Sequence, residues 1–191
     1  MRLISVAIAI LLSTPSWAQI GNPAGMDPAT PEGPAGAPSP HYANTQDKLF
    51  AQLLSSGGLA EVELGKLADG KAQSESVKQF ARRMVQDHSK ANDELAALAK
   101  QASIPLPGQL NPDDRTMKEE LDRPQSSAFD LTYVSSQIVS HQKAAVLLQY
   151  EIGQGQNVEL QKFAAKTLPV VLVHLEMARG ILTQLRSSTA P

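Results

Sequence analysis

The amino-acid sequence predicts an all-α fold, a four-helix bundle with one short extra helix. Apolar residues recur at intervals of three and four in four long segments, as they do on one face of a helix. Aromatic residues make up only 4% of the 191 residues, and Ala, Leu, Gln, Lys and Glu dominate, which favours helices over sheet. Two connections between the segments are short and the middle one is long. These features together indicate a bundle with one core.

The first long helix is predicted over residues 45–70. Seven apolar side chains on it follow helical spacing: Phe50, Leu53, Leu54, Ala60, Leu64, Leu67 and Ala68. Gly57 and Gly58 interrupt this helix at a cost of order 1 kcal/mol each relative to Ala. A neighbouring element is therefore expected to approach closely there. The second helix is predicted to run from an N-cap at Ser74 to about residue 102.

The middle connection, residues 103–126, contains a helix signal of its own. Asn111 followed by Pro112 is typical of a helix N-terminus, where a cap precedes a proline at the first helical position. A short helix is therefore predicted to reach Asp122. A connection of this length favours a crossover of ferritin-like type over a simple up-down order of the long helices.

The last two long helices are also predicted from their caps. Ser127 and Asp130 resemble a capping box that opens the third long helix. Asn157 is the predicted N-cap of the fourth. Pro169 is expected to kink or restart that helix, because proline lacks the backbone N–H that a helix interior requires.

The N-terminus has the order of segments found in a secretory signal peptide. Arg2 precedes an apolar run that ends at Leu12, and small residues follow at Ser16 and Ala18. Cleavage is therefore predicted after Ala18, with export to the periplasm. The apolar run is shorter than the roughly 18 residues that a membrane span needs, so no transmembrane anchor is expected after processing.

Three regions follow from these patterns: a signal peptide over 1–18, a Pro/Gly/Ala-rich linker over 19–44 and a helical-bundle domain over 45–188. The linker has too few large apolar side chains to offset its ordering entropy, which predicts disorder. A net charge of −2 and the absence of cysteine argue against a nucleic-acid partner and against a lipid anchor. An envelope protein remains a candidate partner, and the oligomeric state is left open.

Four polar side chains lie on apolar stripes near the middle of the four long helices. They are Glu61, His88, His141 and His174. At 1.5 Å per residue their positions fall into one layer of the bundle, where they could bind one divalent zinc, copper or iron ion. Four neighbouring residues are candidates to hydrogen-bond these ligands from outside: Asp87, Asp130, Tyr133 and Gln137.

Two other interpretations of this layer stay open. In one, Glu61 accepts hydrogen bonds from the histidines in a metal-free network that fixes helix register. In the other, the stripes are slightly rotated and some of the side chains reach solvent. Di-iron chemistry is disfavoured, because the residues three positions before two of the histidines are Val85 and Val171 instead of Glu. No nucleophile-elbow motif is present, so an enzyme ranks last among the functions.

Several motifs of this sequence occur together in one known family. They are GGLAEVELG at 57–65, FARRMVQDHS at 80–89, FDLTY at 129–133 with His141, and AKTLP at 165–169 with His174. In this order, over about residues 45–186, they resemble the bacterial exported family named domain of unknown function 4142. The resemblance implies a periplasmic, ferritin-like bundle, often labelled a membrane protein because of its leader. It implies no established reaction.

Two functions are compatible with these features. The first is binding of a transition metal by the His/Glu layer, with a role in envelope stress. The second is a structural or protein-interaction module, in which the polar layer only specifies packing.

Overall fold

The computed structural model describes residues 42–123 and 128–188. It contains five helices: α1 Thr45–Lys71, α2 Glu75–Gln101, α3 Pro112–Asp122, α4 Phe129–Gln154 and α5 Val158–Ser188. These two ranges contain no strand, so the predicted all-α fold with a short helix in the middle connection is confirmed. The predicted signal peptide over 1–18 and most of the linker lie outside the described residues.

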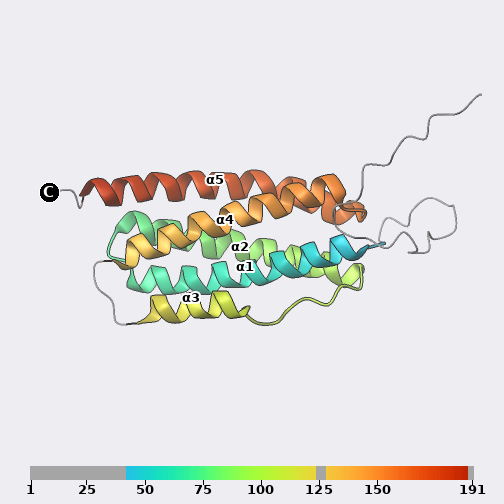
Figure 1. Ribbon diagram of the computed structural model, residues 1–191, viewed down its shortest axis with the longest axis horizontal. Helices are drawn as coiled ribbons and strands as arrows, with labels where there is room; N and C mark the ends of the chain where they lie inside the picture. The colour runs from blue at the N-terminus through green and yellow to red at the C-terminus, as the bar shows by residue number, and fades with distance from the viewer. Residues whose placement is uncertain (1–41, 124–127, 189–191) are drawn as a thin grey trace, which may run out of the picture. The chain divides into compact units, whose positions relative to one another are not determined.

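The four long helices form two hairpins. A short turn joins antiparallel α1 and α2, and another joins antiparallel α4 and α5 (Figure 1). The hairpins meet along two seams, where α1 packs against α4 and α2 packs against α5. The connection that contains α3 runs back along α1, so α2 and α4 point in the same direction. The helices therefore follow the predicted ferritin-like crossover and not the up-down order.

The core consists of two apolar clusters that are separated along the bundle. The main members of the first cluster are Leu64, Val77, Phe80, Met84, Leu121, Phe129, Val134 and Ile181. The main members of the second are Phe50, Leu95, Ile104, Leu148, Leu160, Phe163 and Val171. Each long helix contributes residues to both clusters, and the four predicted polar residues fall between them in the sequence of every helix. A polar layer thus divides the core.

Two of the predicted caps are confirmed. The side chain of Asn111 accepts a hydrogen bond from the backbone N–H of Asp114 at 2.9 Å, and Asn157 accepts one from Leu160 at 3.0 Å. Helix α5 is one continuous element through Pro169, so the expected restart does not occur. By length and hydropathy α5 is also the one helix among the described residues that could cross a membrane; here it supplies part of both core clusters.

The N-terminus of α2 is capped by a residue from another helix. Ser74 occupies the predicted N-cap position, but its side chain makes no capping hydrogen bond. The carboxylate of Asp130, on α4, instead accepts hydrogen bonds from the backbone N–H groups of Gln73 at 3.1 Å and Ser74 at 2.7 Å. The predicted capping box is therefore wrong: Asp130 serves α2, the N-cap of α4 is Ala128, and Ser127 lies outside the described residues.

The opposite end of the bundle is held together by Asp47 of α1. Its side chain accepts a hydrogen bond from Asn44 N–H at 2.7 Å, completing a capping box with that residue. It also accepts from the N–H groups of Gln156 and Asn157 in the α4–α5 turn, at 2.9 and 3.0 Å. Because Asp47 is fully buried, these hydrogen bonds fix the start of α1 against that turn.

The glycine pair in α1 behaves differently at its two positions. A Cβ atom on Gly58 would overlap the side chain of Asn92 on α2, so the predicted close approach is confirmed there. A Cβ on Gly57 would meet no atom within 4 Å, so the prediction is wrong for this residue. Gly57 instead borders open space inside the fold.

Candidate metal centre

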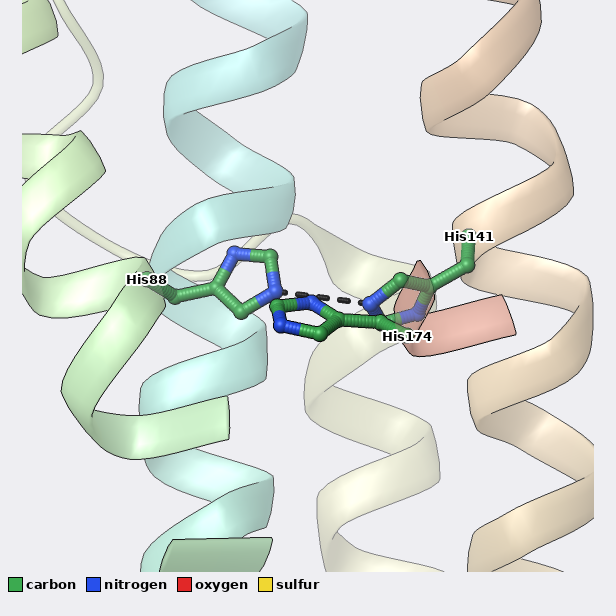
Figure 2. Close-up of side chains that lie close together, drawn as sticks. All are labelled: His88, His141 and His174. Atoms are coloured by element: carbon green, nitrogen blue, oxygen red, sulfur yellow. Dashed lines mark hydrogen bonds between the residues drawn. The ribbon is translucent and has the colours of Figure 1, made fainter. Parts of the chain in front are cut away.

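The polar layer brings together three histidines from three helices, α2, α4 and α5 (Figure 2). One ring nitrogen from each of His88, His141 and His174 lies within 4.8 Å of the other two. The ring centroids are 5.4 to 5.5 Å apart, and the two Nε2 atoms of His88 and His141 are separated by 3.4 Å. Three of the four residues predicted as ligands therefore converge; they are called the histidine triad below.

These separations are compatible with one shared metal ion. Imidazole nitrogens bind zinc at about 2.0–2.1 Å, so two of them in a tetrahedral site are roughly 3.4 Å apart. The His88–His141 pair already has this separation. The widest pair would have to close by no more than about 1.5 Å, which small rotations of the imidazole side chains supply.

Two histidines of the triad are oriented by hydrogen bonds on their outer nitrogens. Nδ1 of His141 lies 2.9 Å from the backbone oxygen of Gln137, and Nε2 of His174 lies 2.9 Å from Oδ2 of Asp87. A carbonyl and a carboxylate only accept, so both ring nitrogens donate and the opposite nitrogens carry lone pairs. In His174 the nitrogen with the lone pair is Nδ1, which is buried without a hydrogen-bond partner. Outer partners of this kind fix the tautomer of metal-binding histidines.

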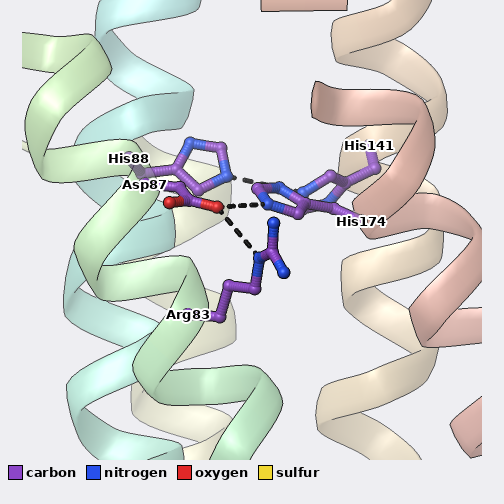
Figure 3. A network of polar contacts seen from close by, with 5 residues as sticks. All are labelled: Arg83, Asp87, His88, His141 and His174. Carbon is purple, nitrogen blue, oxygen red and sulfur yellow. Dashed lines mark hydrogen bonds and ion pairs between the residues drawn. The ribbon is translucent and has the colours of Figure 1, made fainter. Parts of the chain in front are cut away.

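Asp87 is itself held in place by a cation (Figure 3). Its Oδ2 accepts a hydrogen bond from Nε of Arg83 at 3.1 Å, one turn earlier on α2. Partial burial works to raise the pKa of Asp87, but the hydrogen bonds from His174 and Arg83 outweigh it and lower that pKa. The carboxylate is therefore ionised at neutral pH, and Asp87 occupies the outer position that was predicted for it.

The histidines are uncharged at neutral pH. Burial, with added repulsion from the other two imidazoles, lowers the pKa of His88 to about 3. Burial also lowers the pKa of His141 to about 4, and it lowers the pKa of His174 against the opposing effect of Asp87. Neutral imidazoles offer their lone pairs to a metal without first releasing a proton.

Glu61 lies beside the triad but not within it. Its Oε1 is 3.8 Å from Nδ1 of His141, the nitrogen that donates to Gln137 and so faces away from the other histidines. Burial raises the pKa of Glu61 to about 8, against the opposing effect of the Gln137 amide. The prediction of Glu61 as a fourth ligand is therefore not supported by its position. Its Oε2 is buried without a hydrogen-bond partner.

Asp130 and Tyr133 do not have the outer-partner role predicted for them. Asp130 caps α2, and it precedes His141 by eleven residues, about 16 Å along the helix. The ring of Tyr133 packs between those of Phe80 and Phe129, with centroids 6.3 Å from each. Its buried hydroxyl has no hydrogen-bond partner. Helical periodicity places both residues on the inner face, but it does not say which neighbours they meet.

A cavity next to the triad was not predicted from the sequence. Its volume is about 770 Å³, and residues of α1, α2, α4 and α5 and the start of α3 line it. Glu61, His88 and His141 are among the lining residues, whereas His174 is not. No signal in the sequence pointed to it, because the spacing of apolar residues does not show where side chains of neighbouring helices leave a gap, and Gly57, which lines the cavity, was predicted to be a position of close approach.

Comparisons with known proteins agree with this architecture. Residues 32–181 match the family model described as "Domain of unknown function (DUF4142)", and no curated protein matches the chain. The chain is similar to a solved structure, the crystal structure of a DUF305 fragment from Deinococcus radiodurans. The TM-score is 0.67 at 13% sequence identity, covering 75% of this chain and 99% of that one, which shows a shared fold. Since the family model spans most of its length, the chain belongs to the DUF4142 family, whose function is unknown.

Proposed function

We propose that this protein binds one divalent transition-metal ion through His88, His141 and His174. The observation that carries the proposal is the buried, unpartnered Nδ1 of His174, whose ring lies close to those of the other two histidines while Asp87 holds its Nε2. A polar network that served packing alone would be expected to satisfy this nitrogen, because an unpartnered buried acceptor costs about 1–3 kcal/mol.

The donor set favours zinc, copper or iron. Imidazole suits these ions, whereas magnesium and calcium prefer oxygen ligands. Three protein ligands leave a fourth position for water or another small ligand, as in zinc sites that are not purely structural. No carboxylate lies within the triad, which argues against the carboxylate-rich di-iron centres of ferritin-like bundles.

The cellular setting belongs to the same proposal. Export to the periplasm, with cleavage after Ala18, is supported by the order of charged, apolar and small residues in the first 18 positions. A metal-binding bundle there would act in the response to envelope stress. Mass spectrometry of the exported protein should find Gln19 at the N-terminus, and an intact Met1 would contradict the proposed processing.

Metal binding is tested by calorimetric titration of the metal-free protein with zinc and then with copper and ferrous iron. One equivalent is expected to bind, and His174→Ala is expected to reduce the affinity at least about 100-fold, since three ligands share one ion. His41→Ala, in the predicted linker, is the control and should bind as wild type does. Because His174 is buried, His88→Ala provides a second variant at a partly exposed position. Equal heats from wild type and both triad variants would refute the site.

The outer partner gives a separate prediction. Asp87→Asn should lower metal affinity about 10- to 100-fold, because the amide is a weaker acceptor for His174 and no longer stabilises positive charge at the ring. Asp69→Asn is the matched control, since that exposed carboxylate pairs with Arg82 instead. The same titration measures both variants. An Asp87→Asn affinity within twofold of wild type would show that Asp87 does not orient a ligand.

A further inference from the structure

The cavity beside the triad has the size and lining of a small-molecule site. Its volume of about 770 Å³ lies within the roughly 300–1,000 Å³ range of ligand pockets. The walls are largely apolar, with contributions from Leu54, Leu95, Leu147, Phe163 and Val171. Next to the histidine triad the lining includes Glu61, His88 and His141, and this part of the cavity is called its polar end below. This distribution suits a ligand with an apolar body and one polar group.

Some of the large apolar side chains that line the cavity are also exposed. Leu53, Val146 and Tyr150 line the cavity and are 51%, 66% and 44% exposed. Each is on α1 or α4. An exposed apolar border that continues into an apolar interior is typical of a binding groove. It predicts that the apolar part of the ligand extends to these exposed side chains.

The polar end contains a carboxyl oxygen with no partner. Glu61 is only 5% exposed, lines the cavity, and has its Oε2 buried without a hydrogen bond. The Gln137 side chain is near enough to lower the pKa of Glu61, but its two polar atoms are also without a hydrogen-bond partner. Such an oxygen is costly to leave unsatisfied. A hydroxyl group can either donate to a carboxylate or accept from a carboxylic acid. A hydroxyl on a ligand would therefore satisfy Glu61 whether or not this residue is ionised.

The charges around the cavity favour a neutral ligand. Asp113 and Asp114 line it at the start of α3, and Lys143 is the one lysine or arginine among its lining residues. The charge of Lys143 acts on Asp114 and lowers its pKa against the larger effect of burial, so the one cation of the lining lies near one of its carboxyl groups. A negative ligand would meet carboxyl groups there, and burying its charge without a partner is unfavourable.

We infer that this cavity binds a neutral, mainly apolar molecule whose single hydroxyl group forms a hydrogen bond with Glu61. The cavity does not coincide with the metal site, because His88 and His141 line it but His174 does not. The inference does not depend on the proposed metal function, since its contacts are made by the apolar walls and Glu61.

Two probes of matched shape, 4-butylphenol and butylbenzene, test this inference in the purified protein with EDTA present. Both are expected to bind, with 4-butylphenol about tenfold tighter because it alone carries a hydroxyl. Ligand-observed NMR measures both dissociation constants. Glu61→Leu should remove the difference between the probes, and Glu61→Gln, which keeps hydrogen-bonding groups, should retain most of it. A difference that persists in Glu61→Leu would overturn the role of Glu61.

A paired substitution on α1 tests the location. Gly57→Leu places a side chain in the open space of the cavity and should weaken both probes at least about tenfold. Gly70→Leu is the control, because a Cβ there also meets no atom within 4 Å and Gly70 does not line the cavity. Circular dichroism checks that both variants fold. Equal binding by the two variants, or no binding of either probe to wild type, would overturn the inference.

The metal and cavity proposals fail separately. His174→Ala should bind both probes as wild type does while losing metal. Loss of metal binding with retained probe binding therefore contradicts neither proposal, and wild type that binds metal but no probe refutes only the cavity. Sedimentation velocity provides a last test: a dimer that Gly57→Leu dissociates would show that a second copy of the chain occupies the groove.

Discussion

Zinc at 1,000 times its dissociation constant is expected to stabilise the folded wild-type protein by about 4 kcal/mol, and at the same zinc concentration His141→Ala is expected to reduce this gain to about 1.4 kcal/mol or less. The ligands come from α2, α4 and α5, so the unfolded chain does not hold them together and the ion binds mainly the folded state. Urea unfolding followed by circular dichroism, with zinc and with EDTA, measures the difference for each protein.

The stabilities with zinc and with EDTA are compared for one protein at a time, because removing a buried imidazole changes stability by itself. His141 is 1% exposed, and His141→Ala should cost stability even in EDTA. His41→Ala should show the full zinc effect. If zinc stabilised wild type and His141→Ala equally, the ion would be binding elsewhere and the histidine triad would be a packing feature.

The free energy of unfolding is expected to fall as pH rises from about 6.5 to 8, and Glu151 should contribute up to about 1.4 kcal/mol per pH unit to this fall. Below about pH 6.5 the buried histidines, whose pKa values are lowered, act in the opposite direction. Glu151 is fully buried. Burial, followed by the neighbouring Asp47, raises its pKa from 4.5 to about 8. In this window the folded protein keeps the proton and the unfolded chain releases it. Unfolding therefore releases a proton, and higher pH favours unfolding.

Glu151→Gln tests this directly, because the amide is nearly isosteric and does not titrate. In urea unfolding measured at several pH values, the free energy of unfolding of the variant should depend less steeply on pH, by the contribution of one titrating group. Some slope should remain, since the pKa of Glu61 is raised in the same direction. The exposed Glu176→Gln is the control and should keep the wild-type slope. Identical slopes in wild type and Glu151→Gln would show that Glu151 is not protonated in the folded state.

The helices and the depth of the histidines were predictable because both depend on spacing along single helices. His88, His141 and His174 lie on apolar stripes at the middle of their helices, and 1.5 Å per residue is enough to place them at one height. The caps at Asn111 and Asn157 were equally local. These features need no knowledge of the neighbouring helix.

The remaining features depend on contacts between helices. Asp130 has the spacing of a capping residue for its own helix, yet it caps α2, because the start of that helix lies beside it. Glu61 lies at the level of the histidines along the bundle axis, but the rotation of α1 about its own axis places it behind His141. The cavity at Gly57 is a gap between side chains of several helices. Sequence periodicity specifies the buried face of a helix and leaves these pairings undetermined.

The hairpin arrangement has a consequence for the folding kinetics of the bundle. His88 belongs to the α1–α2 hairpin, and His141 and His174 belong to the α4–α5 hairpin. Contacts within each hairpin are local in sequence and can form early, whereas contacts between hairpins require closure of the long connection. A metal ion shared by the triad would join the two hairpins only after they dock. It would therefore slow the unfolding rate while leaving the folding rate nearly unchanged.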